Sequence, residues 1–159
     1  KGVEKYDNVR VGLNSRLDTL QAAILIEKLK IFPDELKQRS SVAQNYEQAL
    51  SPDVNVPRLI DGHTSAWAQY TLIVNNRQGL QNLFKEAKIP SVVYYPKALT
   101  QQAGYKHYPA VSMGVNISEK LSGSVLSLPM HPYLTESSII KTAEIVNQHL
   151  ASIVFGSAN

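Results

Sequence analysis

A polar turn that runs directly into a strongly apolar helical stretch constrains the fold of this chain more than any other feature. The turn spans Gly12 to Arg16, and from Asp18 to Phe32 apolar side chains go most of the way round a helix. Asp18 or Thr19 is placed to cap this helix by accepting a hydrogen bond from a free amide of its first turn. A helix that is apolar on most sides must be buried, either in a core or against another subunit.

Pro33 is expected to end this helix, because its ring clashes with the preceding turn and has no amide proton to donate. A second helix is predicted from Asp34 to Leu50, with one apolar face and one charged face.

The rest of the chain alternates short extended segments with helices. Extended segments are predicted over 54–59, 65–74, 89–95 and 125–128, and helices over 80–87, from 116 onward and over 136–153. Asn116 and Glu119 have the spacing of a capping box at the start of the middle helix. This order predicts an α+β domain with a small sheet that is covered by helices on one face.

Composition excludes several classes of function. The chain has 159 residues, enough for one domain or for one domain and the tail of another, and it has no cysteine for disulfides or thiolate metal sites. Its four histidines lack metal-ligand spacing. The net charge is +3, but the basic residues are scattered, so we expect no nucleic-acid partner. Without a signal-like segment or a long uncharged apolar run, we expect a soluble cytoplasmic protein with no membrane contact, and a first residue other than Met suggests an excised piece.

Four sequence blocks in a fixed order identify a family. They are GLNSRLD at 12–18 with LQAA at 20–23, WAQYT at 67–71, VYYP at 93–96 and LSLPMHP at 126–132. Together they resemble the DegT/DnrJ/EryC1/StrS family of nucleotide-sugar aminotransferases that depend on pyridoxal phosphate. The resemblance covers nearly the whole chain and is closest to members that aminate keto-sugars in lipopolysaccharide O-antigen synthesis.

The resemblance implies the small C-terminal domain of a fold-type-I aminotransferase, an α+β domain whose small sheet packs against helices, plus a long connecting helix. Residues 1–33 would be the tail of the large domain with the connecting helix. Residues 34–155 would be the small domain, and residues 156–159 a tail.

Transamination with pyridoxal phosphate requires a lysine that holds the cofactor as a Schiff base and an acid near the pyridine nitrogen. The resemblance places that lysine in the large domain, upstream of the turn at 12–18. We therefore expect no catalytic residue in this chain, which alone would be inactive, and a cofactor site that lies mostly outside it. Lys97 is the only lysine in a half-apolar setting and is a less favoured alternative for the Schiff base.

Two residues of the turn are candidate ligand contacts. The resemblance implies that Asn14 crosses a dimer interface to hydrogen-bond the cofactor phosphate of the neighbouring subunit, and that Arg16 lies near the substrate or cofactor. The amide of Asn14 can donate without adding charge, and the guanidinium of Arg16 suits a carboxylate or a diphosphate. The alternatives are that Asn14 only stabilises the turn and that Arg16 forms an ion pair with Asp18 or Glu27.

Tyr94 and Tyr95, followed by Pro96, match a family block that usually contains His-Tyr-Pro, and the resemblance places this loop against the nucleotide sugar. A tyrosine ring can stack on a sugar or a base and still donate a hydrogen bond. Because Tyr94 replaces the usual histidine, any proton transfer or phosphate contact made by that histidine is in doubt here. The alternative is that one of the two rings is a core residue, since neighbours in a strand point to opposite faces.

The sequence therefore predicts part of a homodimeric, pyridoxal-phosphate-dependent aminotransferase. Its amino donor would be an amino acid, with glutamate expected, and its acceptor a nucleotide-linked keto-sugar. The apolar helix at 20–31 would be exposed in this chain alone, and we expect self-association or residual binding to the missing large domain. Two alternatives stay open: a free-standing α+β binding module without catalysis, and a sugar dehydratase relative that carries histidine in place of the upstream lysine.

Overall fold

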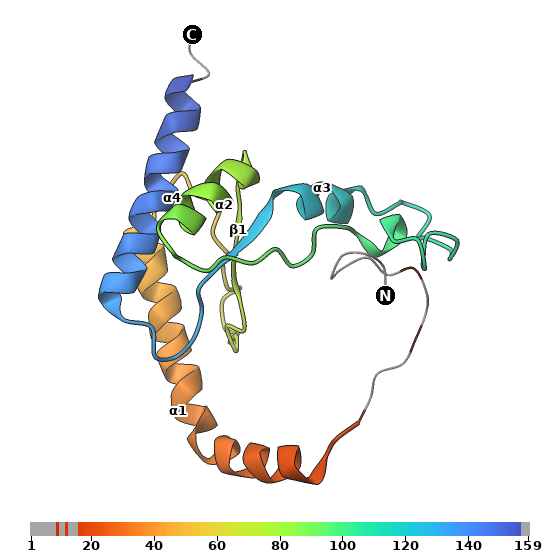
Figure 1. The fold of residues 1–159 in the computed structure, drawn as a ribbon, viewed down its shortest axis with the longest axis vertical. Coiled ribbons are helices and arrows are strands. Elements are labelled where there is room, and N and C mark those ends of the chain that lie inside the picture. The colour runs from red at the N-terminus through yellow and green to blue at the C-terminus, as the bar shows by residue number, and fades with distance from the viewer. Residues whose placement is uncertain (1–8, 10–11, 13–15, 157–159) are drawn as a thin grey trace.

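A computed structural model describes residues 9, 12 and 16–156, with side chains in the last helix described up to residue 153. In chain order the elements are α1 (Thr19–Ala49), β1 (Tyr70–Ile73), α2 (Arg77–Glu86), η1 (Leu99–Gln101, a 3-10 turn), α3 (Asn116–Ser124), β2 (Val125–Leu128) and α4 (Glu136–Gly156). Figure 1 shows this arrangement. The predicted α+β class with a small sheet against helices and a long first helix is confirmed.

The first helix differs from its prediction at Pro33, where it was expected to end, and at Asp18, whose side chain was expected to cap it. α1 continues through Pro33 as one helix of 31 residues, so the expected helix end there is wrong. A proline inside a helix removes one backbone hydrogen bond and kinks the axis without necessarily ending the helix. Figure 1 shows that α1 changes direction sharply in its N-terminal half. Asp18 is the N-cap residue, as expected, but its side chain makes no capping hydrogen bond.

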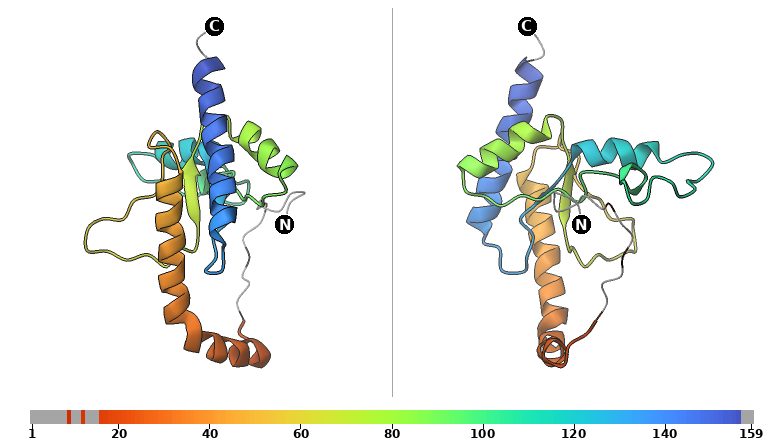
Figure 2. Two further views of the ribbon diagram at one scale, coloured as in Figure 1. Left: turned by 90° about the vertical axis from the view of Figure 1, so that its left-hand side faces the viewer. Right: turned by 45° about the vertical axis from the view of Figure 1, so that its right-hand side comes forward.

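The two parts of α1 have different surroundings. The C-terminal part packs beside α4 and buries Val42, Ala43 and Tyr46. The N-terminal part reaches away from the rest of the domain (Figures 1 and 2). Its apolar side chains are exposed, with Leu20 80% and Ile24 58% accessible. The expected exposed apolar helix is therefore present.

The sheet is antiparallel and short. β1 pairs with β2 from Tyr70 opposite Leu128 to Ile73 opposite Val125, and isolated bridges join Asn55 to Ile73 and Val92 to Ser127. The long strands expected over 65–74 and 89–95 are therefore wrong in extent.

Two local features account for the short strands. Trp67 has φ of +44°, which interrupts the extended backbone just before β1. Pro90 and Pro96 flank Val92 and have no amide proton for a ladder. Segment 89–95 is therefore left with a single bridge to β2.

The core lies between the sheet and the helices α1, α2 and α4. Tyr46 and Tyr70 stack with their ring centres 5.0 Å apart, and both are buried. The other core residues are apolar and come from both strands and all three helices; they include Leu72, Leu80, Phe84, Leu126, Ile139 and Val146. The apolar periodicity that predicted α2 and α4 corresponds to these buried positions.

α3 extends from the start of β2, away from α1 and α4 (Figure 1). The Arg77 guanidinium anchors the junction by donating to the backbone oxygen of Ser122 at 2.6 Å. The predicted capping box is wrong, because Val115 is the N-cap and Asn116 is already helical. The Glu119 carboxylate instead accepts a hydrogen bond from the Thr100 hydroxyl at 2.7 Å. This contact joins α3 to η1.

No helix in the described part of the chain combines the length and apolar character needed to cross a membrane.

Candidate functional site

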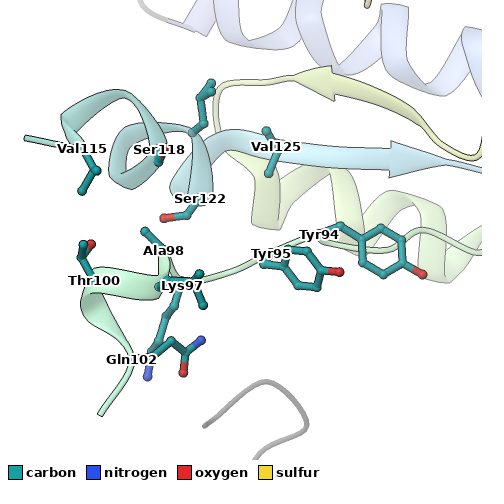
Figure 3. Close-up of a pocket in the computed structure, with 12 residues that line it drawn as sticks. Tyr94, Tyr95, Lys97, Ala98, Thr100, Gln102, Val115, Ser118, Ser122 and Val125 are labelled. Atoms are coloured by element: carbon teal, nitrogen blue, oxygen red, sulfur yellow. The ribbon is translucent and has the colours of Figure 1, made fainter. Parts of the chain in front are cut away.

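A cavity of about 700 Å³ opens between the segment after Val93 and the helix α3. Figure 3 shows the residues around it. One wall comes from segment 94–102, and the opposite wall comes from α3, the residue before it and the start of β2. The lining residues are Tyr94, Tyr95, Lys97, Ala98, Leu99, Thr100, Gln102, Val115, Ser118, Leu121, Ser122 and Val125.

The sheet positions the two tyrosines. Val92 exchanges backbone hydrogen bonds with Ser127 of β2, at 3.2 Å and 2.8 Å, so the chain is held to the sheet until just before Tyr94. The rings of Tyr94 and Tyr95 then meet edge to face, with their centres 5.7 Å apart (Figure 3). Tyr94 is half-buried and Tyr95 is 59% exposed, so neither ring belongs to the buried core. Both rings line the cavity.

The hydrogen bond between Thr100 and Glu119 holds the two walls together. On the α3 wall, Ser118 and Ser122 are four residues apart, a spacing that places side chains on one helix face. Gln102 is almost fully buried at the base of the other wall. The cavity is therefore bounded by aromatic rings, aliphatic side chains and neutral hydrogen-bonding groups.

Among the described residues that line the cavity, Lys97 is the only charged one. None of these described lining residues carries a carboxylate, so they offer no acid to place near a pyridine nitrogen. The described residues also bring no three potential metal ligands together.

The structure brings some of the predicted site residues together and separates others. Tyr94 and Tyr95 share the cavity, and Lys97 lies beside them in sequence. Asn14 lies outside the described residues. Arg16 is exposed and does not line this cavity.

Within the described residues Arg16 forms no ion pair with Asp18 or Glu27. The Glu27 carboxylate instead pairs with the Lys30 ammonium at 2.7 Å.

Sequence reasoning missed the hydroxyl groups of the far wall. Ser118 and Ser122 follow the helix start that was recognised at Asn116, and their spacing alone would have placed them on one face. Nothing in the sequence indicated that this face would lie opposite Tyr94 and Tyr95, because that depends on how α3 leaves β2.

Comparisons with known proteins agree with the four sequence blocks. Residues 1–147 match the model of the DegT/DnrJ/EryC1/StrS aminotransferase family. Over 139 residues the chain is 42% identical to UDP-2-acetamido-2-deoxy-3-oxo-D-glucuronate aminotransferase of Pseudomonas aeruginosa, covering 85% of this chain and 37% of that protein. It is 32% identical over 147 residues to dTDP-3-amino-3,6-dideoxy-alpha-D-galactopyranose transaminase of Aneurinibacillus thermoaerophilus, covering 92% of this chain and 40% of that protein.

A solved structure shows the same fold. The crystal structure of a DegT DnrJ EryC1 StrS aminotransferase from Brucella abortus superposes with a TM-score of 0.81 at 48% identity, over 93% of this chain and 40% of that one. The chain thus spans about two fifths of the length of the relatives it matches. With a family model that matches nearly its whole length and relatives of this identity, the chain belongs to the DegT/DnrJ/EryC1/StrS aminotransferase family.

Proposed function

We propose that the protein containing this chain is a pyridoxal-phosphate-dependent aminotransferase that aminates a nucleotide-linked keto-sugar. The cavity between Tyr94 and α3 is the observation that carries the proposal, together with membership in the family. Both named relatives act at position 3 of a nucleotide sugar, which supports a 3-keto sugar as the acceptor. We further propose an amino-acid donor, glutamate, and a role in O-antigen synthesis in the cytoplasm.

The cavity suits a nucleotide sugar better than the cofactor. Pyridoxal phosphate supplies an electron sink for the amino transfer, and it needs a nearby acid that this lining lacks. A sugar instead requires faces to stack on and neutral groups that hydrogen-bond its hydroxyls. Tyr94 and Tyr95 offer the faces, and Thr100, Ser118 and Ser122 offer the hydroxyl groups. We therefore assign this chain one wall of the sugar site and no cofactor lysine.

The apolar N-terminal part of α1 supports an assembly larger than this chain. Exposed side chains such as Leu20, Ile24 and Leu29 form a surface of the kind that protein interfaces bury. We propose that it packs against the remainder of the polypeptide and a second subunit. In that homodimer Asn14 would reach the cofactor phosphate of the neighbouring subunit, and Arg16, whose side chain is exposed, would meet the substrate.

The test is a borohydride trap on the full-length protein incubated with pyridoxal phosphate, followed by peptide mapping. Borohydride reduces the Schiff base and leaves the cofactor covalently attached to its lysine. A single labelled lysine N-terminal to Lys1 is expected. A label on Lys97 would place the cofactor site in this chain and contradict the assignment of the sugar wall. No label at all would favour the dehydratase relative or the binding module.

A further inference from the structure

The described residues that line the cavity are neutral apart from one that carries a positive charge. Lys97 contributes that charge from the wall that also carries Tyr94 and Tyr95. Within the described residues the Lys97 ammonium has no ion-pair partner, and both ion pairs seen there lie on α1. A cavity lined in this way has one position at which an anionic substituent of a ligand is favoured over a neutral one.

The position of Lys97 in the chain indicates which part of a nucleotide sugar it meets. Only Pro96 separates it from Tyr95, so their α-carbons are no more than about 7 Å apart. Figure 3 shows the Lys97 side chain running toward Gln102 rather than toward the two rings. If the rings face the sugar, as in the proposed function, a ring substituent that points to the Gln102 side of the cavity would meet the Lys97 ammonium. The other anionic group of such a ligand is the diphosphate. It is attached to the anomeric carbon and points away from the remaining substituents of the sugar ring.

We infer that Lys97 is a specificity residue that selects nucleotide sugars whose sugar ring bears a carboxylate. This inference rests on the proposed function. The Pseudomonas aeruginosa relative, 42% identical to this chain, is named for a glucuronate substrate. A charged hydrogen bond from the Lys97 ammonium to a sugar carboxylate replaces the water around both groups, whereas a neutral hydroxymethyl group at the same position leaves the ammonium unpaired.

Two stable ligands isolate this contact without requiring turnover. UDP-N-acetylglucosaminuronate and UDP-N-acetylglucosamine share the nucleotide, the diphosphate and the acetamido group, and they differ only in a carboxylate against a hydroxymethyl at C6. Neither carries a ketone, so equilibrium binding is measured by titration calorimetry on the full-length protein. We expect the uronate to bind about tenfold more tightly, which corresponds to one charge-assisted hydrogen bond.

Variants of Lys97 then identify the source of the preference. Lys97→Met is expected to weaken uronate binding about tenfold and to leave UDP-N-acetylglucosamine binding unchanged, so that the preference disappears. Lys97→Arg should keep most of the preference, because its guanidinium also binds a carboxylate. Lys106→Met is the matched control: it removes the same charge from an exposed lysine outside the cavity lining and should leave the preference intact.

Other outcomes would overturn the inference. Equal weakening of both ligands and of UDP alone by Lys97→Met would mean that Lys97 contacts the diphosphate. Unchanged binding would mean that it stays solvated. Loss of the preference in Lys106→Met as well would indicate a long-range effect of net charge. If the wild-type protein binds both ligands equally, this inference fails and the proposed function stands; if it binds neither and traps no cofactor, both fail.

Discussion

The Tyr70 hydroxyl is buried and has no hydrogen-bond partner among the residues that the structure describes, although its ring is packed between Tyr46 and Trp67. A buried polar group without a partner loses its bonds to water on folding and gains none in return. Tyr46 provides the contrast, because its hydroxyl donates to the Pro129 backbone oxygen at 3.0 Å. The two stacked rings therefore differ in what their hydroxyl groups contribute to stability.

Replacing Tyr70 with phenylalanine is expected to raise the stability of the core by about 1 kcal/mol, since it removes the unpaired hydroxyl and keeps the ring. Tyr46→Phe is the matched control and should lower stability by a similar amount, because it leaves the Pro129 oxygen unpaired. Hydrogen exchange of the β1 amides in the full-length protein measures both effects. Faster exchange of these amides in Tyr70→Phe than in the wild-type protein would show that the Tyr70 hydroxyl of the wild-type protein has a hydrogen-bond partner in solution.

The same two tyrosines make the stability of the core sensitive to alkaline pH. Burial raises the pKa of Tyr46 and of Tyr70 to about 12, and the negative charge of Glu47 adds to the shift for Tyr70. In the unfolded chain both hydroxyls ionise near pH 10. Between these values the unfolded state binds fewer protons than the folded state, so the free energy of unfolding falls as pH rises.

We therefore expect the stabilising effect of the neutral rings to be complete below pH 10 and to be lost as pH rises toward about 12. The urea midpoint of the full-length protein, followed across this range, should fall less steeply in the Tyr46→Phe/Tyr70→Phe double variant. An equal slope in the two proteins would show that other groups cause the alkaline loss.

Arg39 of α1 holds two loops that are far apart in sequence. Its guanidinium donates to the backbone oxygen of Trp67 at 3.0 Å and, more weakly, to that of Met130 at 3.4 Å. Because Trp67 precedes β1 and Met130 follows β2, one side chain fixes the same end of both strands to α1.

Arg39→Met should therefore lower the free energy of unfolding by about 1.5 to 3 kcal/mol, the range for hydrogen bonds from a charged group. Chemical denaturation of the full-length protein measures the change. Lys37→Met is the control, since its exposed ion pair with Asp34 contributes at most about 0.5 kcal/mol. Equal effects from the two variants would contradict a specific role for Arg39.

Elements whose pattern is local were predictable from the sequence. α2, α4 and β2 follow from apolar periodicity or from the turn residues on either side, which agree with their final packing. The continuation of α1 through Pro33 was not, because a proline can kink a helix without ending it, and the local sequence does not decide between the two outcomes. The short β1 also depends on context, since φ at Trp67 is held by contacts such as the bond from Arg39.

Some residues of the candidate site were predictable from local sequence and others were not. Tyr94 and Tyr95 were identified from a sequence block, and the structure places both at the cavity. The α3 wall was not foreseen, because the contact between Thr100 and Glu119 joins residues that no sequence spacing relates. Local sequence thus indicated one wall, and tertiary structure supplies the other.

At the scale of the whole molecule, the exposed apolar side chains of α1 give a test of assembly. Leu20→Glu with Ile24→Glu should weaken the proposed homodimer of the full-length protein, because each change would bury a charge in the interface at a cost of several kcal/mol. Sedimentation velocity measures the shift toward monomer. Ile60→Glu changes an equally exposed side chain in a loop and should leave the dimer intact. An unchanged dimer in the double variant would mean that the interface lies elsewhere.

The core of this domain joins the ends of its sequence. α1 packs against α4, which lies near the other end of the chain. β1 pairs with β2, which follows it by more than 50 residues. During synthesis on the ribosome, the apolar face of α1 is therefore made long before α4, the helix that packs against its C-terminal part. A chain released before α4 is made would expose the side of α1 that α4 covers, in addition to the exposed N-terminal part of α1. Chaperones and proteases act on such exposed apolar surface. Quality control of this protein should thus depend on translation reaching α4.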